Sequence, residues 1–251
     1  MYDLGLVSIS FRKYSPEEIL SAMKKANLSV VEWGSDVHAP YDNEENLNNL
    51  LSLMDKYGVK CCSYGTYFKL GVDNAEELRG YIKAAKKLGT DIVRIWCGEK
   101  GSAEFSEEEK AEFFAEGKKA AKIAEELGAT LCMECHNWTY TDTLETALEL
   151  MDAVNSPNFK MYWQPNQFRT DEENFLYAEK IAKYVEIIHT FNWKGKERFP
   201  LTDGVELWKK YLEKLGIEKP LLLEFMPDNK SGLKRFKINL NNGKKFFCLC
   251  W

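Results

Sequence analysis

The chain has 251 residues, 45% of them hydrophobic, which is enough for one large or two small globular domains with a sizeable core. The net charge is −5 and both signs are mixed along the chain, so the sequence lacks the basic block that a nucleic-acid-binding surface needs. No run approaches the ~20 apolar residues of a membrane span, and Met1 is followed by YDLGLVSIS instead of a signal peptide. We therefore expect a cytoplasmic protein that binds neither nucleic acid nor membrane.

Short runs rich in apolar and β-branched residues alternate with longer amphipathic stretches. The runs that we predict to be strands cover approximately residues 4–10, 30–34, 59–65, 91–98, 129–136, 159–165, 185–191 and 220–226. Their ends recur at intervals of very roughly 24–38 residues, the size of one strand–helix unit.

The stretches between these runs carry helix start and stop signals. The capping-box spacing occurs at Ser15–Glu18, Ser106–Glu109 and Asp142–Glu145, and Pro16 takes the first helical position after Ser15. Glycines follow the expected helices and precede the next strands, at Gly58, Gly89, Gly128 and Gly216. The amphipathic stretches are therefore predicted to be helices.

Eight strand–helix units in this length predict a (β/α)8 TIM barrel that forms a single domain over residues 1–251. An open doubly wound sheet is disfavoured, because SISFRKYSPEE follows the first strand where that fold carries a glycine-rich phosphate turn. The last unit is atypical. Residues 227–251 lack helical periodicity and predict an irregular or incomplete eighth helix.

The segment LCMECHNW (residues 131–138) places two cysteines, a glutamate and a histidine together. Alternate residues of a strand face opposite sides, so Cys132 and Cys135 point apart and cannot close on one zinc ion. A second cysteine pair at zinc-site spacing is absent from the sequence, and the total of seven is odd. We interpret these cysteines as reduced, small core side chains.

Polar side chains end several of the apolar strands. Glu134, His189 and Glu224 end the fifth, seventh and eighth runs, and Gln164 ends the sixth. Glutamate is costly to bury, and in a barrel the carboxyl ends of the strands form the active-site face. The four side chains therefore predict an oxygen-and-nitrogen site for one divalent cation, Mn²⁺, Mg²⁺, Co²⁺ or Zn²⁺. A buried Glu–His ion pair is the purely structural alternative.

At these positions the sequence resembles the xylose isomerase-like TIM barrels, a superfamily of sugar phosphate isomerases and epimerases and of proteins similar to endonuclease IV. The resemblance spans residues 4–226 and is carried by VEWGSDVH, VRIWCG, MECHNWTYTDT, YWQPN, HTFNWKGKERFPL and LLLEF. It implies that Glu134, Gln164, His189 and Glu224 bind the metal. The superfamily has aspartate where Gln164 stands, so we expect weaker metal binding and a more electrophilic metal.

The resemblance further implies a small-molecule sugar or polyol substrate and an enzyme that abstracts a proton next to a carbonyl. One of Glu134 and Glu224 would remove the proton and the other would return it. Return to the opposite face gives epimerisation, and return to the neighbouring carbon gives isomerisation. The sequence does not decide between them, nor whether the protein is a homo-oligomer.

Further polar and aromatic residues lie at or beyond strand ends and are candidates for substrate binding. They are Glu32, His38, Arg94, Trp96, His136 and Arg198, with Lys194 as a weaker candidate. Surface salt bridges and hydrophobic packing are the purely structural alternatives for these side chains.

Three other functions fit the same fold. A dehydratase acting on an inosose-like ketone would begin with the same proton abstraction. A degenerate barrel would bind a sugar without chemistry. A trinuclear zinc nuclease needs many histidines, whereas the sequence has three, so DNA repair is disfavoured.

Overall fold

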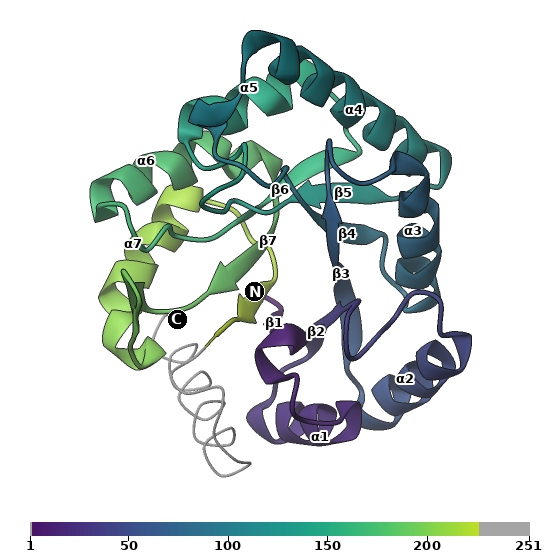
Figure 1. The fold of residues 1–251 in the computed structure, drawn as a ribbon. Coiled ribbons are helices and arrows are strands. Elements are labelled where there is room, and N and C mark those ends of the chain that lie inside the picture. Colours follow the sequence, from purple (N-terminus) through teal and green to yellow (C-terminus); the bar gives the residue numbers. More distant parts are fainter. Residues whose placement is uncertain (1, 226–251) are drawn as a thin grey trace.

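The chain folds into a closed barrel of eight parallel strands surrounded by helices (Figure 1). A computed structural model describes residues 2–225. Around the barrel the strand order is β1-β10-β7-β6-β5-β4-β3-β2. The strands are β1 (Leu4–Val7), β2 (Val30–Gly34), β3 (Lys60–Lys69), β4 (Ile92–Trp96), β5 (Thr130–Met133), β6 (Phe159–Trp163), β7 (Val185–Thr190) and β10 (Leu221–Leu223). The predicted (β/α)8 barrel is confirmed.

Seven α-helices lie between successive barrel strands and cover the outside of the barrel (Figure 1). They are α1 (Pro16–Ala26), α2 (Glu44–Tyr57), α3 (Leu78–Lys87), α4 (Glu107–Glu126), α5 (Leu144–Val154), α6 (Asp171–Ile181) and α7 (Val205–Leu215). Short 3-10 helices are Ser8–Phe11, Ala75–Glu77, Ser102–Glu104, Ala182–Tyr184 and Leu201–Gly204. The expected irregular segment 227–251 lies outside the described residues. No helix within residues 2–225 combines the length and apolar character needed to cross a membrane.

Two of the three predicted capping boxes are present. Ser15 accepts a hydrogen bond from the backbone of Glu18 at the start of α1, and Ser106 with Glu109 does the same for α4. The predicted cap at Asp142 is wrong, because Thr143 caps α5 instead. The carboxylate of Asp142 instead accepts a hydrogen bond from the Ser102 hydroxyl at 2.6 Å.

The buried hydrophobic side chains form two separate clusters, one outside the barrel and one inside it. The larger hydrophobic core lies between the strands and the helices. A smaller cluster within the barrel is formed by Val7, Ile9, Val30, Cys132, Tyr162, Ile187 and Leu222. This apolar plug leaves polar residues to occupy the carboxyl ends of the strands.

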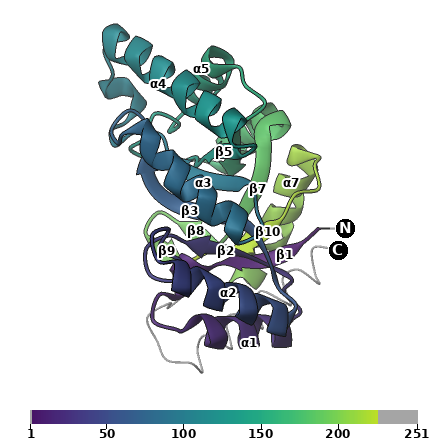
Figure 2. The same ribbon diagram turned by 90° about the vertical axis from the view of Figure 1, so that its right-hand side faces the viewer.

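A hairpin that sequence reasoning missed follows β7. It pairs β8 (Trp193–Lys194) with β9 (Glu197–Arg198) in antiparallel register, Trp193 opposite Arg198. In Figure 2, β1 runs away from the N-terminus, and the hairpin lies at the opposite end of the barrel. The hairpin therefore stands at the carboxyl end of the strands, where the polar side chains gather.

Gly5 lies where the backbones of β1 and β2 approach each other closely. A Cβ added there would lie 2.0 Å from the backbone oxygen of Val30, whereas a Cβ at Gly117 in α4 would meet a methyl group of Val154 at 2.7 Å. We expect Gly5→Ala to lower the free energy of unfolding by about 1–3 kcal/mol or more, because a strand backbone must shift. Gly117→Ala is expected to cost much less, since a side chain can move and alanine favours helix. Urea unfolding of both variants checks this; equal losses would contradict it.

Candidate metal centre and active site

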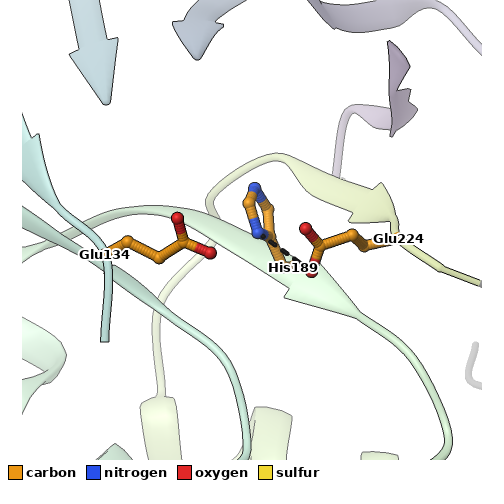
Figure 3. A group of neighbouring side chains, drawn as sticks. All are labelled: Glu134, His189 and Glu224. Atoms are coloured by element: carbon orange, nitrogen blue, oxygen red, sulfur yellow. Dashed lines mark ion pairs between the residues drawn. The ribbon is translucent and has the colours of Figure 1, made fainter. Parts of the chain in front are cut away.

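Three buried side chains from separate strands converge at the carboxyl end of the barrel (Figure 3). Glu134 follows β5, His189 lies in β7 and Glu224 follows β10. One potential ligand atom from each lies within 4.8 Å of the other two. The carboxylates of Glu134 and Glu224 point towards the imidazole from opposite sides (Figure 3). The structure thus brings together three of the four predicted ligands.

The two ring nitrogens of His189 have different partners. Nδ1 lies 3.4 Å from a carboxylate oxygen of Glu224 and 3.3 Å from Oε1 of Gln164, so it faces the cluster. Nε2 lies 3.5 Å from a carboxylate oxygen of the buried Glu32. Burial lowers the pKa of His189, but the carboxylates of Glu224 and Glu32 outweigh it and raise the pKa to about 10. Glu32 therefore fixes the orientation of the ring and leaves Nδ1 for the site.

Gln164, the fourth predicted ligand, is held by its own amide. Its Nε2 donates to the backbone oxygen of Cys135 at 3.0 Å, which turns Oε1 towards His189. The amide oxygen of Gln164 therefore completes a group of four oxygen and nitrogen donors.

Arg94 lies between two carboxylates inside the barrel. Its Nε is 3.2 Å from Glu32, and its Nη1 forms an ion pair with Glu134. Burial raises the pKa of Glu32, but Arg94 and His189 reverse that effect and hold it at about 2. The same carboxylates raise the pKa of Arg94 against the effect of burial. Arg94 is thus a fixed cation that positions Glu134.

Two further residues of β3 support this ion pair, and sequence reasoning missed both. The Ser63 hydroxyl donates to Glu32 at 2.9 Å. A Cβ at Gly65 would lie 2.5 Å from a carboxylate oxygen of Glu32 and 2.9 Å from Nη2 of Arg94. Ser63 and Gly65 are alternate residues of one strand, and only that spacing could have pointed to them.

A cavity of about 250 Å³ opens above the cluster. Among the predicted site residues, those that line it are Arg94, Trp96, Glu134, His136, Gln164 and Glu224. The Trp96 and His136 rings pack together with centroids 4.7 Å apart. Trp193 also lines the cavity, and the lining residues that sequence reasoning missed are Ile9, Arg12, Tyr67, Gln167, Phe191 and Phe225.

The other predicted residues lie outside the cavity wall. Arg198 is exposed, and its guanidinium stacks over the rings of Trp193 at 4.5 Å and Phe225 at 5.2 Å. His38 is buried elsewhere, with Nε2 3.0 Å from the backbone oxygen of Tyr14. Glu32 is fully buried and does not line the cavity. It contacts Arg94, which does line the cavity, and His189.

The cysteines of LCMECHNW lie on opposite sides of the barrel wall. Cys132 belongs to the cluster within the barrel and Cys135 to the core outside it. Both are free thiols, and burial raises the pKa of Cys135 to about 12. The predicted opposite orientation of the two cysteines is confirmed.

The donor set at the cluster fits a divalent cation. Two carboxylates, an imidazole and an amide oxygen are ligands that Mn²⁺, Mg²⁺, Co²⁺ and Zn²⁺ accept. The ion pair to Arg94 uses one oxygen of Glu134, Oε2. The second ring nitrogen of His189 contacts a carboxylate, as is usual for histidine that binds a metal.

Known proteins share this fold over nearly the whole chain. The probable 3-DHS dehydratase AsbF from Bacillus anthracis superposes with a TM-score of 0.78 and 17% identity, covering 99% of each chain. The IOLI protein with a bound zinc atom gives 0.74 and 17%, covering 98% and 96%. D-psicose 3-epimerase from Clostridium cellulolyticum H10 gives 0.71 and 11%, covering 98% and 97%.

Comparison by sequence gives a closer but shorter match and a family. A 3-dehydroshikimate dehydratase from Bacillus anthracis is 35% identical over 72 residues, 29% of this chain and 26% of that protein. The match thus spans about a quarter of the length of this curated relative. Residues 20–240 match the family of xylose isomerase-like TIM barrels. The chain belongs to the xylose isomerase-like TIM barrel family.

Proposed function

We propose that the protein is a divalent-metal-dependent enzyme that removes a proton from the carbon next to the carbonyl of a sugar or related polyol. The observation that carries this proposal is the buried cluster of Glu134, His189 and Glu224, whose two glutamates line a cavity. These three side chains, with Oε1 of Gln164, would hold the cation. When bound, it would polarise the carbonyl and stabilise negative charge on its oxygen.

The two glutamates supply the acid–base pair. Glu134 and Glu224 face each other across His189 and both line the cavity (Figure 3). One would take the proton from carbon while the other returns it. Return to the opposite face gives an epimerase, and return to the adjacent carbon gives an isomerase.

The cavity wall offers groups that suit a sugar. The indole N–H of Trp96 is buried and has no hydrogen-bond partner among the described residues, so it is available to a substrate hydroxyl. His136 packs against the same indole, which helps to fix the position of the indole. Trp193, with Arg198 stacked over it, forms another part of the wall.

Dehydration is the second candidate reaction. It is favoured by the 35% identity to a 3-dehydroshikimate dehydratase over 72 residues. It would begin with the same proton abstraction. The electron pair left on carbon would then expel the hydroxyl of the neighbouring carbon, which takes a proton from one of the two glutamates, in its acid form, and leaves as water. Mass spectrometry separates the two, because dehydration removes one water whereas isomerisation and epimerisation leave the mass unchanged.

Removing either carboxylate tests the ligand assignment. We expect Glu134→Gln and Glu224→Gln each to weaken Mn²⁺ binding by more than about 100-fold, beyond the range seen for residues outside the ligand set. The exposed Glu213→Gln serves as the control and should bind normally. Calorimetric titration of the metal-free proteins measures the affinity, and deuterium wash-in over free and phosphorylated ketoses measures proton abstraction. Retention of stoichiometric metal by both ligand variants would reject the assignment, and absence of exchange in the wild type would indicate a binding-only barrel.

Gln164 sets the charge of the site. Gln164→Glu keeps the length of the side chain, loses the hydrogen bond donated to the Cys135 backbone and adds a negative charge beside the cation. Because the added charge attracts the cation more than the lost hydrogen bond disturbs the site, we expect Mn²⁺ affinity to rise by roughly tenfold. Gln167→Glu adds the same charge to the cavity wall but outside the donor group, and should change affinity far less. Equal effects of the two substitutions would show that Gln164 is not a ligand.

Arg94 stabilises the buried carboxylates of Glu32 and Glu134. Arg94→Met leaves Glu134 without its cation and Glu32 with only the imidazole of His189, and we expect the metal-free protein to lose about 3–5 kcal/mol of unfolding free energy. Adding Glu32→Gln should recover part of that loss. The exposed Arg79→Met, which breaks ion pairs on the helix surface, should cost at most about 1 kcal/mol. Urea unfolding in the presence of a chelator gives these values; a loss at Arg94 no larger than at Arg79 would contradict the role.

A further inference from the structure

A second cavity of about 300 Å³ lies beside the reaction cavity. It is enclosed by the segment after β6, the hairpin after β7, and helices α6 and α7. Three side chains, Gln167, Phe191 and Trp193, line both cavities. The two cavities therefore lie next to each other, bounded in part by the same three residues.

The segments that carry these residues are held together by the backbone. Gly195 donates from its N–H to the backbone oxygen of Gln167 at 2.9 Å, which ties the hairpin to the segment after β6. The backbone N–H of Asn166 donates a hydrogen bond to the side-chain oxygen of Asn174 at 2.7 Å. The second cavity is therefore preformed, as ligand sites usually are.

The lining of the second cavity combines donors, acceptors and aromatic rings. Lys194 is exposed and offers its ammonium group as a donor, and the amide of Gln167 offers both a donor and an acceptor. Asp171 is an acceptor that already takes a hydrogen bond from the Tyr211 hydroxyl at 3.3 Å. Mixed donors and acceptors beside an indole suit the hydroxyls and C–H groups of a sugar ring.

The charges argue against a phosphate in this cavity. The first turn of α6 carries Asp171, Glu172 and Glu173, which repel an anion. Arg169 is already engaged, since it donates to the backbone oxygen of Asp142 and lies 3.9 Å from Glu173. Arg169 and Lys194 together carry fewer charges than these three carboxylates, of which Asp171 lines the cavity, so a neutral polyhydroxylated group fits better.

We propose that this second cavity binds a second sugar unit joined to the reacting ketose, so that the substrate class is a disaccharide or other glycoside with a free carbonyl end. The proposal rests on the proposed function of the cluster. The volume of about 300 Å³ equals about ten water molecules at about 30 Å³ each, which is room for one sugar ring. Contacts remote from the reacting carbon would then contribute to kcat/KM.

Binding tests the second cavity without requiring turnover. The Mn²⁺-loaded protein is titrated calorimetrically with D-fructose and with isomaltulose and turanose, two glucosyl-fructoses that differ in linkage. We expect one of the disaccharides to bind at least about tenfold more tightly than D-fructose. Leu207→Trp fills the second cavity from α7 and should abolish that gain. Leu176→Trp on α6, where the leucine is 49% exposed and lines neither cavity, is the matched control and should retain it.

A milder variant guards against misfolding. Lys194→Met changes an exposed side chain and should reduce the disaccharide preference while circular dichroism stays unchanged. Equal affinity for D-fructose and both disaccharides would overturn the proposal. Tighter binding of fructose 6-phosphate than of either disaccharide, lost in Lys194→Met, would also overturn it and indicate a phosphate site.

The two proposals fail in different ways. Disaccharide preference that disappears in Leu207→Trp, without deuterium exchange into any bound ketose, would support the second cavity and contradict the proposed chemistry. Deuterium exchange into D-fructose without any disaccharide preference would support the chemistry and reject the second cavity.

Discussion

A line of alternating buried charges crosses the barrel interior, and the site depends on it. The line runs through Glu224, His189, Glu32, Arg94 and Glu134, from β10 across β7, β2 and β4 to the end of β5. A buried carboxylate without a partner would cost several kcal/mol, and here each lies against an imidazole or a guanidinium. The line therefore fixes the two outer carboxylates in place, facing the cavity from opposite sides.

This arrangement separates positioning from chemistry. Glu32 is fully buried and Arg94 lines the cavity wall, and both hold other side chains, whereas the carboxylates of Glu134 and Glu224 face the cavity as the acid–base pair proposed above. A Cβ at Gly65 would clash with Glu32 and Arg94, so this position of β3 requires a residue without a side chain. The resulting site is rigid, and rigid placement of acid–base groups is what proton transfer requires.

Gln164 places a neutral amide oxygen beside the imidazole of His189. An amide replaces the aspartate expected from the family resemblance, and it is locked by a hydrogen bond to the Cys135 backbone. A neutral donor leaves more positive charge on a bound cation, which favours stronger polarisation of a carbonyl at the expense of metal affinity. The neighbouring cavity shares Gln167 and Trp193 with the first, and the proposed two-unit ligand rests on that adjacency.

The sequence by itself determined the barrel and three of the clustered residues. Apolar runs ending in Glu134, His189 and Glu224 have one physical reading, because a glutamate or histidine inside such a run needs a buried polar partner. The roles of Glu32 and Arg94 as partners of those residues were decided only by tertiary structure. Strand pairing and side-chain reach bring them within ion-pair distance, and no local pattern encodes that contact.

The surroundings of the site also came only from the tertiary structure. The hairpin of β8 and β9, the position of His38 away from the cavity and the second cavity depend on how loops after different strands pack together. Local residue types set strands, helices and caps, because those follow from periodicity and hydrogen bonding close in sequence. Loop packing joins residues far apart in the chain, so it is fixed by the closed barrel and not by any one segment.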